Sequence, residues 1–365
     1  MEDSMRHVRK VLAHLFLVGA VLSMLLSVAV PGSAAQVSNS TGSITGTVTD
    51  PQGAAVADAK VTVSNKETGT SQMLKTNGDG SFTSGSLPPG NYQILIESPN
   101  FKTIQATTVV QVGQIATFSA KLELGASSNI IEVTSSAVQI NSEQATVQDV
   151  LTAADIDQLP VNGRNFLDLA TPEPGVQIQD GATFDPTKNG YSSLSFGGRF
   201  GRSARIEVDG VDISDETVGT VTQNIPQSAI QEFQVSQSSL DLSTELTSSG
   251  TVNVVTKSGT NDLHGGAYYY GRSDQTSARI APEQLDFGRK QFGADLGGPI
   301  WRNKLFFYGN FERTDQSLAN PVQLNGDFSG LSGSFGAPFT EREYLGRVDY
   351  KPTGLFFTGL TMTRT

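Results

Sequence analysis

The chain has 365 residues, enough for two or three domains, and it combines 38 glycines with only 17% charged residues. This composition is typical of a turn-rich β protein rather than a helical one. The formal net charge of -11 argues against a nucleic-acid partner, and the absence of cysteine excludes disulfides and thiolate–metal sites.

The N-terminal segment has the pattern of a secretory signal peptide. A basic start precedes a long apolar run and an exit of small residues. Cleavage is expected between Ala35 and Gln36, which would remove residues 1–35. An uncleaved membrane anchor is the alternative, because the apolar run approaches spanning length. The sequence does not distinguish Met1 from Met5 as the start of translation.

Residues 42–125 predict a small β-sandwich. Short runs of alternating polar and apolar residues are separated by turn signals, of which Leu-Pro-Pro-Gly at 87–90 is the clearest. In the run 91–97 the side chains of Tyr92 and Ile94 fall on one face of a strand. We therefore expect both side chains in the core of the sandwich.

This module resembles the carboxypeptidase regulatory-like domain, a transthyretin-like sandwich. The matching residues set turns or fill the core, and they are Gly46, Val48, Asp50, Gly53, Val61, Gly80, Phe82, Leu87, Pro88, Pro89, Gly90 and Tyr92. The resemblance implies no catalytic residue. The fold is related to starch-binding modules, but the sequence shows no aromatic pair typical of a sugar platform. A spacer or docking role is therefore favoured, with carbohydrate binding as the alternative.

Residues 126–140 predict a linker that contains a short extended segment. Positions 126–129 are small and polar, and the following run 130–135 is rich in β-branched residues with one acidic residue. Such a run can serve as a free strand that a partner pairs with, or as the last strand of the sandwich. Both alternatives stay open at this point.

Residues 141–265 predict a domain of mixed α and β structure. Apolar residues within 147–159 recur near a period of 3.6, which predicts a helix that ends at Pro160. The segment 204–213 predicts a strand, a tight Asp-Gly turn at 209–210 and a second strand.

The end of this domain predicts a strand between two turns. Val252, Val254 and Val255 are β-branched and lie between Gly250 and Gly259, after which turn residues follow. Taken alone, this stretch would also suit a hairpin in an ordinary β domain.

Residues 266–365 alternate aromatic-rich segments with polar turns. On the run 305–312, Leu305 and Phe307 share one face, whereas Phe306 and Asn310 share the other. Two faces of unequal polarity are typical of strands in a membrane β-barrel, although a soluble sandwich gives a similar alternation.

From residue 43 to about residue 350 the modules resemble, in order, those of TonB-dependent outer-membrane receptors, in particular the Oar-like group. The motif that closes the plug domain in these receptors is matched by Gly250, Val252, Asn253, Val254, Thr256, Lys257 and Gly259. The segments 159–166 and 206–212 also resemble the Oar-like plug. One departure is the run 244–247, where the family usually has Tyr-Gly.

The resemblance implies a mainly β protein: a transthyretin-like sandwich, an α+β plug and the first strands of an outer-membrane barrel. It implies a receptor or transporter in the outer membrane of a Gram-negative bacterium, in contact with outer-membrane lipid and an unidentified extracellular ligand. A TonB-type energy-coupling protein is the implied partner. Its docking segment, the TonB box, would be Ile131, Glu132, Val133, Thr134 and Ser135. The alternative is a cell-surface adhesion protein that binds through the sandwich.

No enzymatic activity, cofactor or metal site is predicted. After signal cleavage only His264 remains for a Ser-His-Asp arrangement, and it lies in a predicted turn. The carboxylates around 209–216 do not fit the ligand spacing of a calcium loop. Residues 266–365 have room for only a few membrane-crossing strands. We therefore expect an incomplete barrel that cannot insert by itself, because lipid cannot satisfy an open sheet edge.

Overall fold

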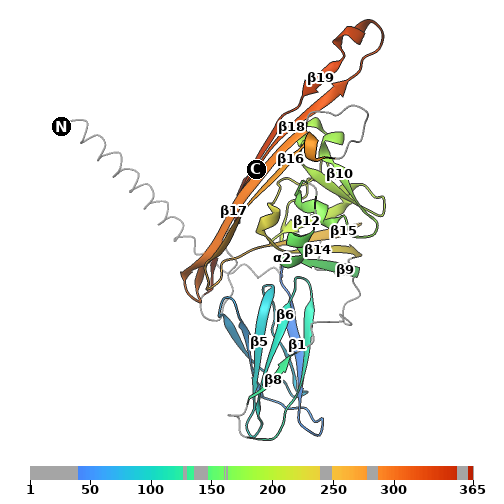
Figure 1. Ribbon diagram of the computed structural model, residues 1–365. Helices are drawn as coiled ribbons and strands as arrows, with labels where there is room; N and C mark the ends of the chain where they lie inside the picture. Colours follow the sequence, from blue (N-terminus) through green and yellow to red (C-terminus); the bar gives the residue numbers. More distant parts are fainter. Residues whose placement is uncertain are drawn as a thin grey trace, which may run out of the picture. The chain divides into compact units, whose positions relative to one another are not determined.

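The structure, a computed structural model, describes residues 40–125, 130–134, 147–159, 161, 163–238, 249–277, 287–351 and 361–364 (Figure 1). The expected cleavage site at Ala35 and Gln36 lies outside the described residues, as does Ser135 of the candidate TonB box. Within the described part of the chain, no helix is both long enough and apolar enough to cross a membrane.

The first module is a sandwich of two β-sheets. One sheet has the order β4-β1-β7, with bounds β1 Ser43–Thr49, β4 Ser81–Thr83 and β7 Ile115–Lys121. The other has the order β3-β2-β5-β6-β8, with bounds β2 Lys60–Asn65, β3 Ser71–Lys75, β5 Gly90–Glu97, β6 Thr103–Val110 and β8 Ile130–Thr134. The pairs β1–β7 and β6–β8 are parallel, and the other pairs are antiparallel.

The predicted core of the sandwich is confirmed. Strand β5 alternates buried and less buried residues, and Tyr92, Ile94 and Ile96 all lie in one apolar cluster between the sheets. The hydroxyl of Tyr92 is not orphaned by burial, because it donates a hydrogen bond to the carbonyl oxygen of Pro88 at 2.8 Å.

The middle domain, here the described residues of 147–256, is built on a second five-stranded sheet. Its order is β13-β12-β15-β14-β9, with bounds β9 Val147–Thr152, β12 Ala204–Val208, β13 Val211–Asp212, β14 Ile230–Ser238 and β15 Gly250–Thr256. A two-stranded sheet joins β10 Val176–Asp180 to β11 Ser192–Phe196. The helices are α2 Ala153–Gln158 and the 3-10 turns η1 Phe166–Ala170, η2 Gly181–Thr183, η3 Pro186–Lys188, η4 Gly201–Ser203 and η5 Gln227–Ala229.

The helix predicted over 147–159 is only half correct. Residues Val147–Thr152 form strand β9, which pairs antiparallel with β14, and the helix is confined to Ala153–Gln158. Thr152 is the residue that separates the two elements. Its extended backbone ends the strand, while its side chain and that of Asp155 form a capping box that begins the helix. Pairing with β14 overrides the helical period in the first half.

The predicted Asp-Gly hairpin is confirmed. Strands β12 and β13 are antiparallel, and the turn residues Asp209 and Gly210 have φ angles of 50° and 80°. Positive φ at both central positions is the geometry that matches the twist of a two-residue hairpin.

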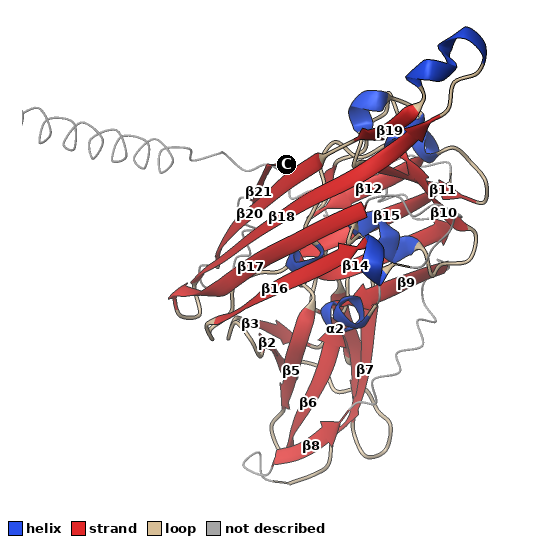
Figure 2. Ribbon diagram, turned by 45° about the horizontal axis from the view of Figure 1, so that its top comes forward, coloured by secondary structure: helices blue, strands red, loops and turns tan. Residues whose placement is uncertain are grey.

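The C-terminal sheet is antiparallel throughout, and its described strands form an open sheet (Figure 2). The path is β16-β17-β18-β20-β21, with bounds β16 His264–Ser273, β17 Phe287–Trp301, β18 Leu305–Val322, β20 Phe339–Tyr350 and β21 Thr361–Arg364. Strand β19 Gly333–Gly336 pairs with the far end of β18, and the 3-10 turns are η6 Asp274–Thr276 and η7 Gly326–Leu331. At 15 and 18 residues, β17 and β18 exceed the roughly 9–11 residues that cross a bilayer.

Candidate functional site

The residues that resemble the plug motif form the centre of the middle domain. Strand β15 is buried at every position and lies between β12, which runs parallel to it, and β14, which runs antiparallel. Val252 and Val254 are fully buried in the apolar cluster of this domain. β-Branched residues on both faces are expected for a strand that is covered on both sides.

The motif continues into the connection that joins the middle domain to the C-terminal sheet. The backbone N–H of Lys257 donates to the carbonyl oxygen of Ala229 at 2.7 Å. A Cβ atom at Gly259 would lie 2.3 Å from the carbonyl oxygen of Phe307, so this position has no room for a side chain. Glycine is needed here because two backbones approach closely.

A buried polar network around Arg347 ties the middle domain to strand β20. The Nε of Arg347 donates to both carboxylate oxygens of Asp349 at 3.1 and 3.0 Å. Its Nη1 lies 3.3 Å from the Asp209 carboxylate and donates to the carbonyl oxygen of Thr256 at 2.9 Å. Asp209 in turn accepts hydrogen bonds from the backbone and the side chain of Thr256. Arg347 is 8% exposed and Asp349 is 2% exposed.

A second polar contact is centred on Ser228. Its hydroxyl oxygen accepts a hydrogen bond from Asn310 Nδ2 at 2.9 Å, and its carbonyl oxygen accepts one from the Tyr308 hydroxyl at 3.2 Å. The Tyr268 hydroxyl lies 3.1 Å from the Ser228 hydroxyl and also donates to Glu312. One loop of the middle domain thus contacts strands β16 and β18.

A polar cavity of about 260 Å³ lies between the middle domain and the face of the C-terminal sheet that contacts this domain. From the middle domain it is lined by residues such as Asp168 and Asn224, and from the sheet by Arg289, Glu312 and Glu343. Burial raises the pKa of Asp168 to about 6, and the nearby Arg289 opposes this rise.

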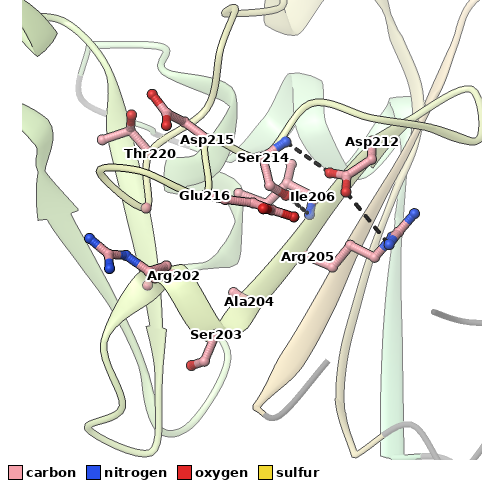
Figure 3. Close-up of a pocket in the computed structure, with 12 residues that line it drawn as sticks. Arg202, Ser203, Ala204, Arg205, Ile206, Asp212, Ser214, Asp215, Glu216 and Thr220 are labelled. Carbon is pink, nitrogen blue, oxygen red and sulfur yellow. Dashed lines mark hydrogen bonds and ion pairs between the residues drawn. The ribbon is translucent and has the colours of Figure 1, made fainter. Parts of the chain in front are cut away.

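A second cavity, of about 250 Å³, lies within the middle domain beside the β12–β13 hairpin (Figure 3). Arg205 lies 3.5 Å from the carboxylate of Asp212, which also accepts a hydrogen bond from the backbone N–H of Ser214. Nearby, Lys188 forms a salt bridge with Asp215 and helps to hold the pKa of that carboxyl below its usual range. Among the described residues, no group of three or more His, Cys, Asp or Glu side chains could hold a metal ion.

The candidate TonB box coincides with strand β8. Residues 130–134 pair in parallel with β6, with Val133 opposite Ala106. The described part of this segment is therefore the terminal strand of the second sandwich sheet, the alternative that the sequence left open. Its role as a partner-binding strand stays a prediction.

The face of the C-terminal sheet that points away from the middle domain is apolar. Polar side chains such as Glu312 and Arg347 point to the other face, and their neighbours along each strand point outward. Exposed large apolar side chains on this outer side are Tyr269, Phe292, Leu296, Ile300, Trp301, Tyr344, Val348 and Tyr350.

Charged residues mark the two ends of this apolar band. At the short β17–β18 turn, Lys304 lies 4.4 Å from the ring of Trp301. Toward the long β18–β20 connection, four residues of neighbouring strands lie opposite one another: Tyr269, Phe292, Arg313 and Arg342. The two arginines of this row are the first on the outer side at this end of the band. From Arg342 to Tyr350, β20 spans nine residues including both ends, which matches the length of strand that crosses a bilayer.

Sequence reasoning did not identify Arg347, Ser228 or Asn224, which make the contacts between the two modules. One sequence pattern did point to the face of the sheet on which these contacts lie. A polar or charged residue that recurs on one face of an otherwise aromatic strand, as Asn310 and Glu312 do, indicates a face turned toward polar surroundings.

Glu232 is a buried carboxyl at a contact between the middle domain and the sandwich. It is 3% exposed and accepts a hydrogen bond from the backbone N–H of Val112 at 2.7 Å. Burial raises its pKa to about 7, and the hydrogen bond from Val112 opposes this rise. A raised pKa means that the folded state holds the proton more tightly than the unfolded state does.

We therefore predict that Glu232 makes the chain less stable as the pH rises. Its contribution should be fully present below about pH 4.5 and lost by about pH 7, a change on the order of 3 kcal/mol. Glu232→Gln, which keeps an acceptor for Val112, should flatten this dependence in urea unfolding at pH 4.5 and pH 8. Glu97→Gln, at an exposed salt bridge with Lys60, is the control. Identical pH slopes for wild type and Glu232→Gln would contradict the prediction.

Two segments of the chain, one near each end, match the models of known protein domains. Residues 43–123 match the model of the carboxypeptidase regulatory-like domain, and residues 255–355 match that of an outer membrane beta barrel domain. The TonB-dependent transporter Oar of Myxococcus xanthus is 27% identical over 361 residues, covering 87% of this chain and 33% of that protein. The chain thus spans about a third of the length of this curated relative.

Solved structures of outer-membrane receptors also align with the chain. The siderophore receptor PirA of Acinetobacter baumannii aligns at 21% identity and a TM-score of 0.41, over 57% of this chain and 29% of that one. The outer membrane transporter YddB of Escherichia coli aligns at 12% identity and a TM-score of 0.44, over 56% of this chain and 30% of that one.

The domain matches and the curated relative indicate a location in the outer membrane of a Gram-negative bacterium. The curated relative is a transporter rather than an enzyme. This chain is similar to the TonB-dependent transporter Oar, and it matches a carboxypeptidase regulatory-like domain ahead of an outer membrane beta barrel domain.

Proposed function

We propose that this chain is part of a TonB-dependent transporter that takes up a ligand across the outer membrane. The observation that carries the proposal is the two-faced C-terminal sheet. One face is polar and covered by the middle domain, and the other exposes an apolar band about as long as a bilayer is thick. The wall of a barrel that encloses a plug needs an apolar outer face toward lipid and a polar inner face toward the plug. The named relative supports the assignment. No comparison supports the adhesion alternative.

In this proposal the segments have distinct roles. Residues 1–35 direct export, and 42–125 form the sandwich. Residues 126–140 carry the coupling segment, 141–265 form the plug, and 266–365 begin the barrel wall. The transporter moves its ligand without making or breaking covalent bonds, so we infer no catalytic residue.

The experiment is fractionation of cells that make the protein from its own gene, with and without a functional TonB protein. We expect the protein in the outer membrane in both strains, and energised ligand uptake only when TonB is present. Recovery in the periplasm or the inner membrane, or uptake that is independent of TonB, would contradict the proposed function.

A TonB-type protein is the proposed partner of residues 131–135, by addition of a strand. Strand β8 ends its sheet, so it pairs with β6 on one side only within the described residues. Main-chain hydrogen bonds supply most of the affinity in such pairing.

Val133→Pro should therefore abolish TonB-dependent uptake, because proline has no N–H to donate and fixes φ. Ligand binding at the cell surface should stay at the wild-type level. Val133→Thr keeps both the N–H and the β-branch, and it serves as the matched control. Transport that survives the proline substitution would move the coupling segment elsewhere in the chain.

A further inference from the structure

The cavity between the middle domain and the C-terminal sheet lies toward the long connection from β18 to β20. Its lining includes Arg289 and Gln291 near the start of β17, and Phe339 and Glu341 at the start of β20. These positions are far from the short turn between Trp301 and Leu305. In outer-membrane barrels, long connections face outside and short turns face the periplasm. The cavity is therefore on the side from which an external ligand arrives.

The cavity carries an excess of negative charge. Its lining includes the carboxylates Asp168, Asp180, Glu312, Glu341 and Glu343. Only two arginines line the same space, so three negative charges remain when all these groups are ionised. Glu312 and Glu343 are buried, and buried negative charge in excess of the nearby positive charge is costly, which favours a cation in the cavity.

The two arginines do not neutralise the cavity through salt bridges. Arg164 is held over the rings of Tyr268 and Tyr270, with its Cζ 4.9 Å from each ring centre. The Nε of Arg289 donates to Gln316 at 2.8 Å. Neither arginine forms a salt bridge with a carboxylate of the cavity in the described part of the chain.

Unsatisfied acceptors, independent of the charge, point in the same direction. Asn224 is 4% exposed, and its Nδ2 donates to the Gly190 carbonyl oxygen at 3.0 Å and to Glu341 at 2.7 Å. Its Oδ1 is buried and has no hydrogen-bond partner among the described residues. Glu343 is 8% exposed, and no salt bridge joins its carboxylate to another described residue. One donor, the Nε of Arg164, is also unpaired.

A buried acceptor without a donor is expensive, so it indicates a missing partner that supplies N–H groups. A bare metal ion is a poor match, because the described residues contain no cluster of ligands for one. An organic ammonium or guanidinium group supplies both positive charge and several N–H donors. The ring of Phe339, which packs against Gly190, adds an aromatic wall that such a group can stack on.

We propose that this cavity binds a small organic cation bearing an ammonium or guanidinium group, as a ligand site on the outer side of the plug. The inference rests on the proposed transport function for its biological meaning. The binding itself depends only on Glu343, Glu341 and Asn224 and can be measured without transport.

The test uses the 365-residue chain, purified in detergent, and agmatine as the probe, because agmatine carries both an ammonium and a guanidinium group. Titration calorimetry should detect agmatine binding that weakens as salt rises, and no binding of glutarate, a dianion of similar length. Glu343→Gln should weaken agmatine binding at least tenfold, whereas Glu343→Asp should retain most of it. Asp212→Asn, a carboxylate of the other cavity, should leave binding unchanged.

Three results would overturn the proposal: no agmatine binding to the wild-type chain, equal binding of glutarate, or equal losses in Glu343→Gln and Asp212→Asn. The wild-type comparison of agmatine with glutarate decides the matter even if a variant does not fold. Agmatine binding in a protein absent from the outer membrane would contradict the transport function and leave the cavity assignment intact. An outer-membrane transporter that ignores agmatine would overturn the cavity assignment alone.

Discussion

Replacing Arg347 with methionine is expected to weaken the packing of the middle domain on the C-terminal sheet by about 3–5 kcal/mol. The substitution removes the guanidinium group that pairs with the buried carboxylates of both Asp209 and Asp349. Asp349 is 2% exposed, so water cannot replace the lost partner. Urea unfolding of the chain in detergent, monitored by hydrogen exchange at Thr256, measures the loss.

Arg313→Met is a closely matched control. Arg313 pairs with Asp315 two residues further along its strand, as Arg347 pairs with Asp349, and the Nε–carboxylate distance is 2.9 Å. The difference is exposure, because both side chains of the Arg313 pair are 36% exposed. An exposed pair contributes little to stability, because water solvates both ions when the pair is broken. Equal losses in the two variants would show that the Arg347 network does not hold the modules together.

Tyr92→Ala should cost the sandwich about 3–5 kcal/mol of unfolding free energy, as aromatic-to-alanine changes in cores do. Tyr92 is 2% exposed between the two sheets, so its removal leaves a cavity. Tyr92→Phe removes only the hydrogen bond to Pro88 and should cost about 1 kcal/mol.

The segment 40–125, made alone, is the material for this measurement, because we predict that it folds as a soluble monomer. Met73→Ala, at a side chain that is 72% exposed, is the surface control and should be nearly neutral. A segment without cooperative unfolding, or a neutral Tyr92→Ala, would refute its independence.

The local alternation of residues predicted much of the fold. On the run 305–312, the even-numbered positions Phe306, Tyr308 and Asn310 are buried, and the odd-numbered positions are less buried. Tyr308 and Asn310 both contact Ser228 of the middle domain. Period-two patterns identify such strands because each side chain points away from its neighbours. The Asp209–Gly210 turn could also be predicted from the sequence, because few residue pairs have a positive φ at both positions.

The remaining features depend on contacts between residues far apart in the sequence, which local patterns do not predict. Strand β9 has a helical pattern of apolar residues, yet it becomes a strand because β14 offers it a partner distant in the sequence. The same holds for Arg347, whose partner Asp209 is 138 residues away. A charged residue on an aromatic strand indicates a polar face, but it does not indicate which side chain it will meet. For the candidate coupling segment, the sequence left open whether it is a free strand or the last strand of the sandwich, because its pairing partner β6 cannot be recognised from local patterns.

The outer face of the C-terminal sheet is expected to lie in lipid, and the proposed transport function depends on this placement. The chain has no cysteine, so single cysteines can be placed along 305–312 and spin-labelled in the protein made from its own gene, in its outer membrane. Labels at Phe307 and Phe311 should be accessible to dissolved oxygen from the lipid phase. Labels at Tyr308 and Asn310 should be shielded from it. Oxygen accessibility without this period of two, or shielding of Phe307 and Phe311, would contradict the account.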